Sequence, residues 1–175
     1  MNITVNTNKS VMISINPKWV DKIFFGNKRR EIRLRAPKNF VGWFYVYCTN
    51  SNKEYIKMCE NFVYYGKEKI DDKGSYLNGK VVGKFYCNKI EKIKLSAYDD
   101  GEDVVYDYET ATLNRDELLE FSNLTNEELH NYLDKNEGGY AINITNIEVF
   151  DEPRELKRYG IKQAPQSWCY IKGEY

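Results

Sequence analysis

Residues 12–35 constrain the fold of this chain more than any other segment, because they predict a strand, a helix and a second strand in succession. The run VMISI (residues 11–15) is β-branched and apolar, which is typical of a buried strand. Asn16-Pro17 supplies an N-cap followed by proline at the first helical position, and Gly26 offers a left-handed stop. The interval between these signals predicts a helix of about two to three turns.

The charged run KRREIRLR (28–35) completes this unit as a strand. Apolar and charged side chains alternate along it, which places them on opposite faces. The apolar face carries Ile32 and Leu34, and the charged face carries Glu31, Arg33 and Arg35. We therefore expect the strand–helix–strand unit to carry a charged functional groove.

Three further apolar and aromatic runs predict strands, at residues 41–49, 80–95 and 140–150. Gly83 lies inside the second of these runs. A glycine within a strand indicates a bulge or a bend at which another backbone comes close.

Helical signals are short. Two helices are predicted at Asn114–Ser122 and Thr125–Lys135, the second opened by a capping box from Thr125 to Glu128. A third, brief helix is expected in PRELKRYG (153–160), where the glycine ends it.

Three segments have weaker patterns. Residues 1–10 are polar and are interpreted as an N-terminal arm or a short edge strand. Residues 50–79 mix a possible helix (Glu54–Phe62) with a Lys-, Asp- and Gly-rich stretch, and we interpret them as an insertion. The acidic segment 98–110 is not expected to form a core element.

The order of these elements predicts a single domain spanning residues 1–175. Five or six strands interrupted by short helices, with too few helices for parallel α/β layers, are typical of an α+β fold. The expected architecture is a mixed β-barrel of five to six strands with short peripheral helices.

The charge balance limits the partners that this chain can hold. Lys plus Arg and Asp plus Glu number 26 each, so no global positive field attracts a long polyanion and any nucleic-acid contact must be local. No basic segment followed by an apolar run opens the sequence, and no run of about 18 apolar residues occurs. We therefore expect a cytoplasmic protein with no membrane partner.

Few residues of this chain are candidates for metal ligands or catalytic nucleophiles. The four cysteines are far apart and lack C-x-x-C spacing, so we expect buried thiols: Cys48, Cys59, Cys87 and Cys169. His130 is the only histidine and is expected on the surface of its helix. The acidic residues 99–103 lack the ligand spacing of a calcium loop. We expect neither a metal nor another cofactor.

The charged run at 28–35 has two interpretations from its residues. Opposite charges two positions apart on a strand neutralise each other and still present donors and acceptors to a base edge or a phosphate. Charge runs are also commonly a solvated strand face with a weak surface ion pair. Tyr45, Tyr47, Trp168 and Tyr170 are similarly either stacking groups or core.

The arrangement of these segments resembles the ASCH family of the PUA-like superfamily, in particular small bacterial and phage members. The similarity lies in the first strand and helix, the string G-x-K-x-x-E-x-R from Gly26 to Arg33, the strand GKVVGKFYCNKI, and the blocks GGYAINITNIEVFDEP and APQSWCYI. It covers nearly the whole chain apart from residues 50–79. The resemblance implies a PUA-like fold whose cleft beside the first helix takes up RNA or a modified nucleobase or nucleotide.

The resemblance also implies which side chains bind the ligand. Carried over by position, the ligand-binding residues are Lys28, Glu31 and Arg33 after the first helix, Ser14 and Asn16 at the end of the first strand, and Gln166, Ser167 and Trp168 near the C-terminal block.

Two alternatives stay open. Some ASCH members are amidohydrolases that act on acylated cytidine through a lysine, a threonine nucleophile and a distal glutamate. Glu31 stands at the threonine position here, which removes the nucleophile and disfavours that reaction. If the chain is an enzyme, Lys28 and Glu31 are the catalytic candidates, with Glu127 or Glu128 as the distal carboxylate.

The other alternative is a phage or prophage interaction protein. Its partner would be a host protein, bound through the 50–79 insertion and the acidic 98–110 segment. A nuclease activity, which occurs in the wider family, is not favoured, because the chain lacks clustered metal-ligating carboxylates and a second histidine.

Overall fold

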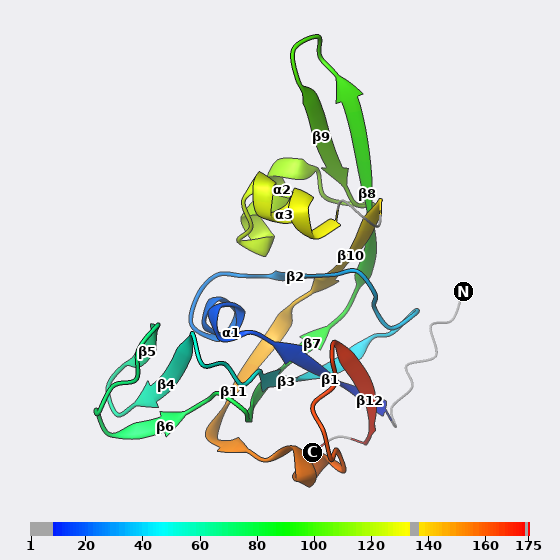
Figure 1. The fold of residues 1–175 in the computed structure, drawn as a ribbon. Helices are drawn as coiled ribbons and strands as arrows, with labels where there is room; N and C mark the ends of the chain where they lie inside the picture. The colour runs from blue at the N-terminus through cyan, green and yellow to red at the C-terminus, as the bar shows by residue number, and fades with distance from the viewer. Residues whose placement is uncertain (1–8, 134–136, 174) are drawn as a thin grey trace. The chain divides into compact units, whose positions relative to one another are not determined.

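The computed structural model describes residues 9–133, 137–173 and 175 (Figure 1). Most of the predicted arm 1–10 therefore lies outside the described residues. Contacts group the chain into two compact units. Unit 1 contains the described part of Met1–Gly26 with Val41–Tyr86 and Thr145–Tyr175, and unit 2 contains Asn27–Phe40 and Cys87–Ile144. The single-domain organisation over residues 1–175 stays a prediction.

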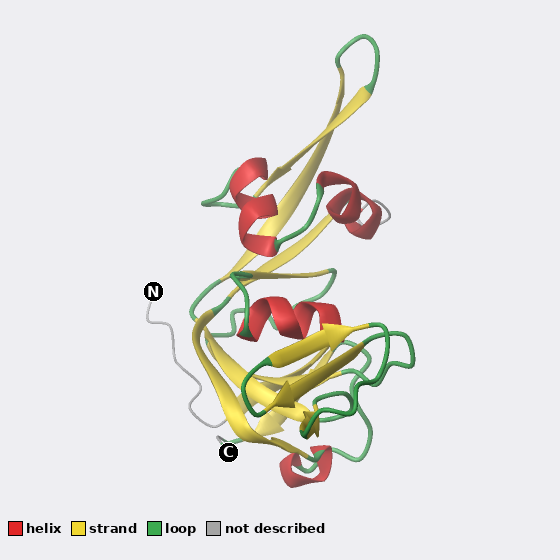
Figure 2. Ribbon diagram, turned by 90° about the vertical axis from the view of Figure 1, so that its left-hand side faces the viewer, coloured by secondary structure: helices red, strands yellow, loops and turns green. Residues whose placement is uncertain are grey.

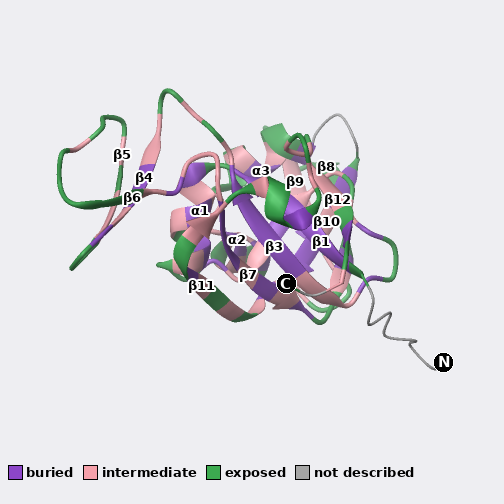
Figure 3. Ribbon diagram, turned by 90° about the horizontal axis from the view of Figure 1, so that it is seen from below, coloured by how far each residue is buried: buried purple, intermediate pink, exposed green. Residues whose placement is uncertain are grey.

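The centre of unit 1 is a five-stranded mixed sheet in the order β11-β7-β3-β1-β12. Its strands are β1 (Lys9–Ile15), β3 (Gly42–Cys48), β7 (Val81–Cys87), β11 (Thr145–Arg154) and β12 (Trp168–Lys172). β1 runs parallel to β3 and antiparallel to β12. Two of the three inner strands, β1 and β3, are almost wholly buried (Figure 3), as expected for β-branched and aromatic runs covered on both faces.

Two short helices belong to unit 1. Helix α1 (Pro17–Phe24) starts at the predicted proline and buries Pro17, Val20 and Ile23. The 3₁₀ helix η2 (Leu156–Tyr159) ends at Gly160, which has the left-handed φ of 71° that its sequence position predicts.

Residues 50–79 form a second sheet of unit 1, in the order β5-β4-β6. Its strands are β4 (Tyr55–Cys59), β5 (Val63–Gly66) and β6 (Gly74–Tyr76). The helix expected at Glu54–Phe62 is wrong, because β4 pairs with a strand on each side and fully buries Ile56. Cross-strand pairing outweighs the local helical preference here.

Unit 2 contains a four-stranded sheet in the order β2-β10-β8-β9, with two helices (Figure 2). Its elements are β2 (Arg30–Arg33), β8 (Ile90–Asp99), β9 (Val104–Glu109), α2 (Arg115–Ser122), α3 (Asn126–Leu133) and β10 (Gly138–Asn143). All three strand pairings are antiparallel. The apolar core between sheet and helices consists of Ile32, Ile93, Tyr108, Leu118, Leu129, Leu133 and Ala141.

The acidic segment 98–110 is part of this sheet, which corrects the expectation that it forms no core element. It supplies the end of β8 and all of β9, and Tyr108 is fully buried. The acidic residues at the tip, Asp99 to Asp103, are exposed. Tyr108 and the partly buried Tyr106 pack this strand against the core, and its ladder with β8 runs from Val104 to Glu109.

The α+β class is confirmed, with twelve strands in the described residues instead of five or six. The predicted strands 80–95 and 140–150 are each two strands, because the chain passes between the units after Tyr86 and after Ile144. The segments 50–79 and 98–110 add β4, β5, β6 and β9. The same division separates the elements of residues 12–35: β1 and α1 lie in unit 1, and β2 lies in unit 2.

Among the described residues, no helix has the length and apolar character needed to cross a membrane.

The N-cap residue of helix α2, Asn114, offers a test of the fold. The Asn114 side-chain oxygen accepts from the Glu117 N–H at 3.0 Å, and the Glu117 carboxylate accepts from the Asn114 N–H at 3.2 Å. Asn114→Ala is expected to lower the free energy of unfolding by about 1 kcal/mol in urea titrations, because it removes the first of these bonds. Asn114→Asp keeps a side-chain oxygen that can accept this bond, so it is the matched control and should leave the stability nearly unchanged. Equal stability of both variants and the wild type would contradict this role.

Candidate functional site

Three charged side chains of unit 2 form one cluster around Glu31. One Glu31 oxygen lies 3.5 Å from the Lys28 ammonium, and the other accepts a hydrogen bond from Arg33 Nε at 2.9 Å. Lys28 is 2% exposed and Glu31 is 5% exposed, while Arg33 is half-buried. We call Lys28, Glu31 and Arg33 the charged cluster. It contains two cations and one anion, and therefore carries a net charge of +1.

Strand β2 positions this cluster. β2 pairs only with β10 in the described sheet, and is therefore an edge strand. Alternation directs Ile32 into the apolar core and its neighbours Glu31 and Arg33 to the other face, as the sequence predicts. The predicted charged face is more enclosed than expected, because Lys28 and Glu31 are both buried.

Lys28 is held by the end of a helix as well as by Glu31. Its ammonium donates to the carbonyl of Ser122 at 2.6 Å, and Ser122 is the last residue of α2. A cation at this end satisfies an orphan carbonyl and is favoured by the helix dipole. Lys28 thus connects α2 to the start of β2 and fixes the position of the Glu31 carboxylate.

Tyr132 of α3 is a fourth member of the site that the sequence did not reveal. Burial raises the pKa of its phenol, the Arg33 charge lowers it, and the Glu31 charge raises it. Its hydroxyl therefore lies within the electrostatic reach of both cluster residues, although 42% of the residue is exposed. As one of 15 tyrosines, it carried no distinguishing signal in the sequence.

The predicted residues of unit 1 form a separate group at the end of β1. The Ser14 hydroxyl donates to the Pro165 carbonyl at 2.6 Å, and the Ser14 N–H donates to the Ser167 carbonyl at 2.9 Å. The structure therefore brings Ser14 and the corner at 165–167 together. Gln166 is exposed at this corner.

Asn16 differs in detail from its prediction. It is the N-cap residue of α1, with an extended backbone, but its side chain does not cap the helix. Its side-chain oxygen instead accepts from the Thr49 hydroxyl at 2.9 Å. Asn16 therefore joins the end of β1 to the end of β3.

Trp168 contributes an aromatic surface on the edge strand β12. Its ring meets that of Tyr170 edge-on, with 5.4 Å between centroids, and the Lys9 ammonium lies 5.5 Å from the Tyr170 centroid. Tyr170 is 47% exposed. Exposed rings beside a lysine can stack on bases while the cation meets phosphate. Tyr45 and Tyr47, by contrast, are core residues.

The other candidates of the sequence analysis are placed as follows. The Glu128 carboxylate accepts from the Thr125 N–H at 2.9 Å in the predicted capping box, and Glu127 is exposed. His130 is half-buried, which corrects its expected surface position, because α3 places its ring 3.8 Å from that of Tyr106 on β9.

Three of the four cysteines are buried as predicted, and Cys169 is half-buried. Burial raises the pKa of Cys48 to about 12 and that of Cys87 to about 11, so both stay protonated and poorly nucleophilic at neutral pH. Within the described part of the chain, no group of three or more His, Cys, Asp or Glu residues is arranged to hold a metal ion.

Sequence comparison identifies no relative: no family model matches the chain, and no curated protein matches it.

Solved structures, in contrast, share its fold. The ASCH protein of Zymomonas mobilis is similar with a TM-score of 0.56 and 16% identity, over 92% of this chain and 86% of that one. Two mutant forms of the same protein are similar with TM-scores of 0.53 and 0.51, at 16% identity, over 92% of this chain and 88% and 87% of theirs. The described residues therefore share the fold of these ASCH proteins, as the resemblance predicted, although their strands form three sheets and not the closed barrel that was expected.

Proposed function

We propose that this chain is a nucleic-acid or nucleotide-binding protein that takes up RNA or a modified nucleobase at the charged cluster of unit 2. The observation that carries the proposal is the arrangement at β2, where a buried carboxylate orients Arg33. A guanidinium fixed in this way is a preorganised donor for phosphate or for base acceptors. The net charge of +1 favours an anionic ligand.

Each member of the site has a role in this proposal. Arg33 donates to the ligand, Glu31 holds Arg33 in place, and Lys28 neutralises Glu31 while anchoring it to α2. The ring of Tyr132 offers a half-exposed surface for stacking on a base. The zero net charge of the whole chain favours a short ligand over a long polyanion.

Unit 1 contributes a second surface to the proposal. Ser14, Asn16, Gln166, Ser167 and Trp168 are proposed ligand-binding residues, with Trp168 and Tyr170 stacking on unpaired bases. The fold similarity to ASCH proteins supports this assignment, as does the lysine beside Tyr170.

Substitution of Arg33 tests the unit 2 site directly. Arg33→Gln is expected to weaken binding of a fluorescent single-stranded RNA hexamer at least about tenfold, because a bond to a charged donor contributes about 1.5–3 kcal/mol. Lys92→Gln is the matched control, since Lys92 is an exposed cation of β8 in the same sheet. It should change the affinity less than about twofold. Equal affinities of wild type and Arg33→Gln would remove the site from β2.

The ligand class follows from the same titration. DNA of the same sequence, free nucleotides and nucleosides are compared with the RNA by anisotropy or competition. Incubation with acylated cytidine, followed by chromatography, separates binding from hydrolysis. Under the binding proposal the nucleoside is recovered unchanged. Turnover that Glu31→Gln abolishes would replace binding by the amidohydrolase alternative.

A further inference from the structure

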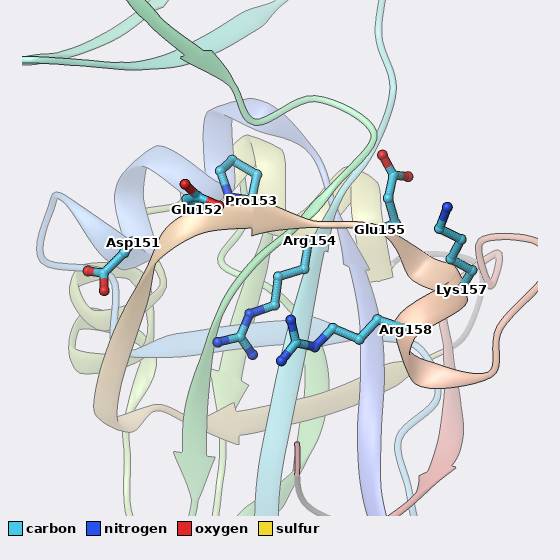
Figure 4. A pocket seen from close by; sticks show the side chains of 7 residues that line it. All are labelled: Asp151, Glu152, Pro153, Arg154, Glu155, Lys157 and Arg158. Atoms are coloured by element: carbon cyan, nitrogen blue, oxygen red, sulfur yellow. The ribbon is translucent and has the colours of Figure 1, made fainter.

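A pocket of about 630 Å³ lies in unit 1, at the end of β11 and the start of η2 (Figure 4). It shares no residue with the sites described above. Its lining residues are Asp151, Glu152, Pro153, Arg154, Glu155, Lys157 and Arg158.

An irregularity in β11 creates this pocket. Val149 pairs with Gly83 and Arg154 pairs with Val81, so five steps along β11 correspond to two steps along β7. The extra residues bulge out of the ladder. Pro153 has no N–H to return to the ladder, and η2 begins directly after Glu155. Arg154 and Arg158 are consequently four residues apart around a tight turn.

Arg154 is held rigidly on the wall of this pocket. Its guanidinium carbon lies 3.6 Å from the centroid of the Phe150 ring, and its Nη1 donates to the Tyr159 hydroxyl at 3.3 Å. Both aromatic residues are buried in the core of unit 1. A guanidinium stacked and bonded in this way loses little further entropy when it binds a ligand.

The guanidinium group of Arg158 points toward that of Arg154. Its side chain is exposed, and Figure 4 shows the two guanidinium groups pointing toward one another. Both arginine charges act on the Tyr159 hydroxyl, which lowers its pKa against the larger effect of burial. Two cations that approach each other repel unless an anion lies between them.

The nearby carboxylates do not supply that anion. In Figure 4 the carboxyl groups of Asp151, Glu152 and Glu155 point away from the guanidinium pair. Glu155 is paired with Lys80, whose bond and charge lower the Glu155 pKa. Among the described residues, neither Arg154 nor Arg158 takes part in an ion pair with a carboxylate.

We propose that Arg154 and Arg158 bind a terminal phosphate group, such as that of a nucleoside monophosphate or of a 5′-phosphorylated oligonucleotide. A phosphomonoester carries a charge of about −1.5 to −2 at neutral pH, which matches two guanidinium charges better than the single charge of a diester or a carboxylate. The pocket is in the size range of small-ligand sites and so has room for more than a bare anion. The inference goes beyond the proposed function, because none of the residues that line this pocket belongs to the proposed ligand-binding sites.

Calorimetric titration of the full chain with adenosine 5′-monophosphate and with inorganic phosphate, at constant ionic strength, tests the pocket. Arg158→Gln is expected to weaken both affinities at least about tenfold, since each charge-assisted bond contributes about 1.5–3 kcal/mol. Lys172→Gln is the matched control, because Lys172 is an exposed cation of unit 1 on β12. It should change either affinity less than about twofold. Equal effects of the two variants, or no binding by the wild type, would overturn the proposal.

Two further arms identify the source of the phosphate and check the fold. An RNA hexamer with a 5′-phosphate is compared with the same hexamer bearing a 5′-hydroxyl, and preference for the former assigns the site to an RNA end. Binding of adenosine monophosphate with no preference between the hexamers assigns it to a free nucleotide. Arg154→Lys keeps the charge and loses the planar fork, and is expected to weaken phosphate binding in a protein that still folds, with a melting temperature lowered by the loss of the Phe150 stacking and the Tyr159 bond. Wild-type affinity of this variant would overturn the role of Arg154. Arg33→Gln is titrated with the 5′-hydroxyl RNA hexamer and Arg158→Gln with inorganic phosphate, so failure of the unit 2 site and failure of this pocket remain distinguishable.

Discussion

Replacing Glu31 with alanine is expected to lower the free energy of unfolding by about 3–5 kcal/mol, because it leaves two cations without their shared counter-charge. Lys28 is 2% exposed and cannot move into water without giving up its bond to the Ser122 carbonyl. Arg33 loses the carboxylate that orients its guanidinium. Urea titration, followed by circular dichroism, measures the change.

A double variant separates the charge effect from the packing effect. Lys28→Met combined with Glu31→Leu removes the buried pair and leaves apolar side chains of similar size, which is often neutral or stabilising. It also loses the bond to Ser122, which contributes about 1.5–3 kcal/mol because its donor is charged. We therefore expect the double variant to be clearly more stable than Glu31→Ala. If both variants unfold at the same urea concentration, the cost lies in packing and the cluster is not an electrostatic unit.

The parts of the fold that sequence reasoning located are those with local causes. The start of α1 at Pro17, the capping box from Thr125 to Glu128 and the stop at Gly160 each depend on residues within one turn. The alternation that places Ile32 in the core and Glu31 on the other face is similarly local. Short-range backbone geometry and periodicity were sufficient for these predictions.

The errors arise where distant segments decide the structure. Residues 54–62 contain helix-forming residues, yet β4 forms there because β5 and β6 pair with it on both sides. The sequence pattern of residues 80–95 predicts one strand, although the structure contains two, β7 and β8, which belong to different sheets. Tyr108 makes an acidic segment part of a core through contacts with α2 and its neighbours. None of these partners is identifiable from the segment itself.

The candidate sites show the same difference between residues that are close in sequence and residues that only the fold brings together. Lys28, Glu31 and Arg33 were found because they are neighbours in sequence on one strand. Tyr132 comes from a helix about a hundred positions later, and only the packing of α3 brings it to them. The arginine pair at 154 and 158 depends on a bulge that no periodicity indicates. Clusters assembled by tertiary contacts required the structure.

Gly83→Ala is expected to lower the free energy of unfolding by about 3 kcal/mol. A Cβ at this position would overlap the backbone oxygen of Glu148 and would lie 2.7 Å from Cε1 of Phe24. The Glu148 oxygen belongs to β11, which pairs with β7 at this position and cannot shift without breaking the ladder. Overpacking of this kind costs about 1–3 kcal/mol per site, at the upper end when backbone is the obstacle. Thermal and urea unfolding of the variant measure the loss.

Two comparisons establish whether the Glu148 oxygen or the Phe24 ring causes the destabilisation of Gly83→Ala. Gly66→Ala is the matched control, because the three atoms nearest to the added Cβ all belong to the side chain of Tyr64, which can rotate away at the cost of its hydrogen bond to the Glu68 carbonyl. It should cost less than about 1 kcal/mol. Phe24→Ala combined with Gly83→Ala removes the ring but keeps the Glu148 oxygen, so it should remain less stable than Phe24→Ala alone. Equal stability of these two variants would show that the ring, and not the approach of β11, requires glycine at position 83. If the double variant is still less stable than Phe24→Ala, the close approach of the β7 and β11 backbones is what requires glycine at position 83. A glycine within a strand predicts such an approach.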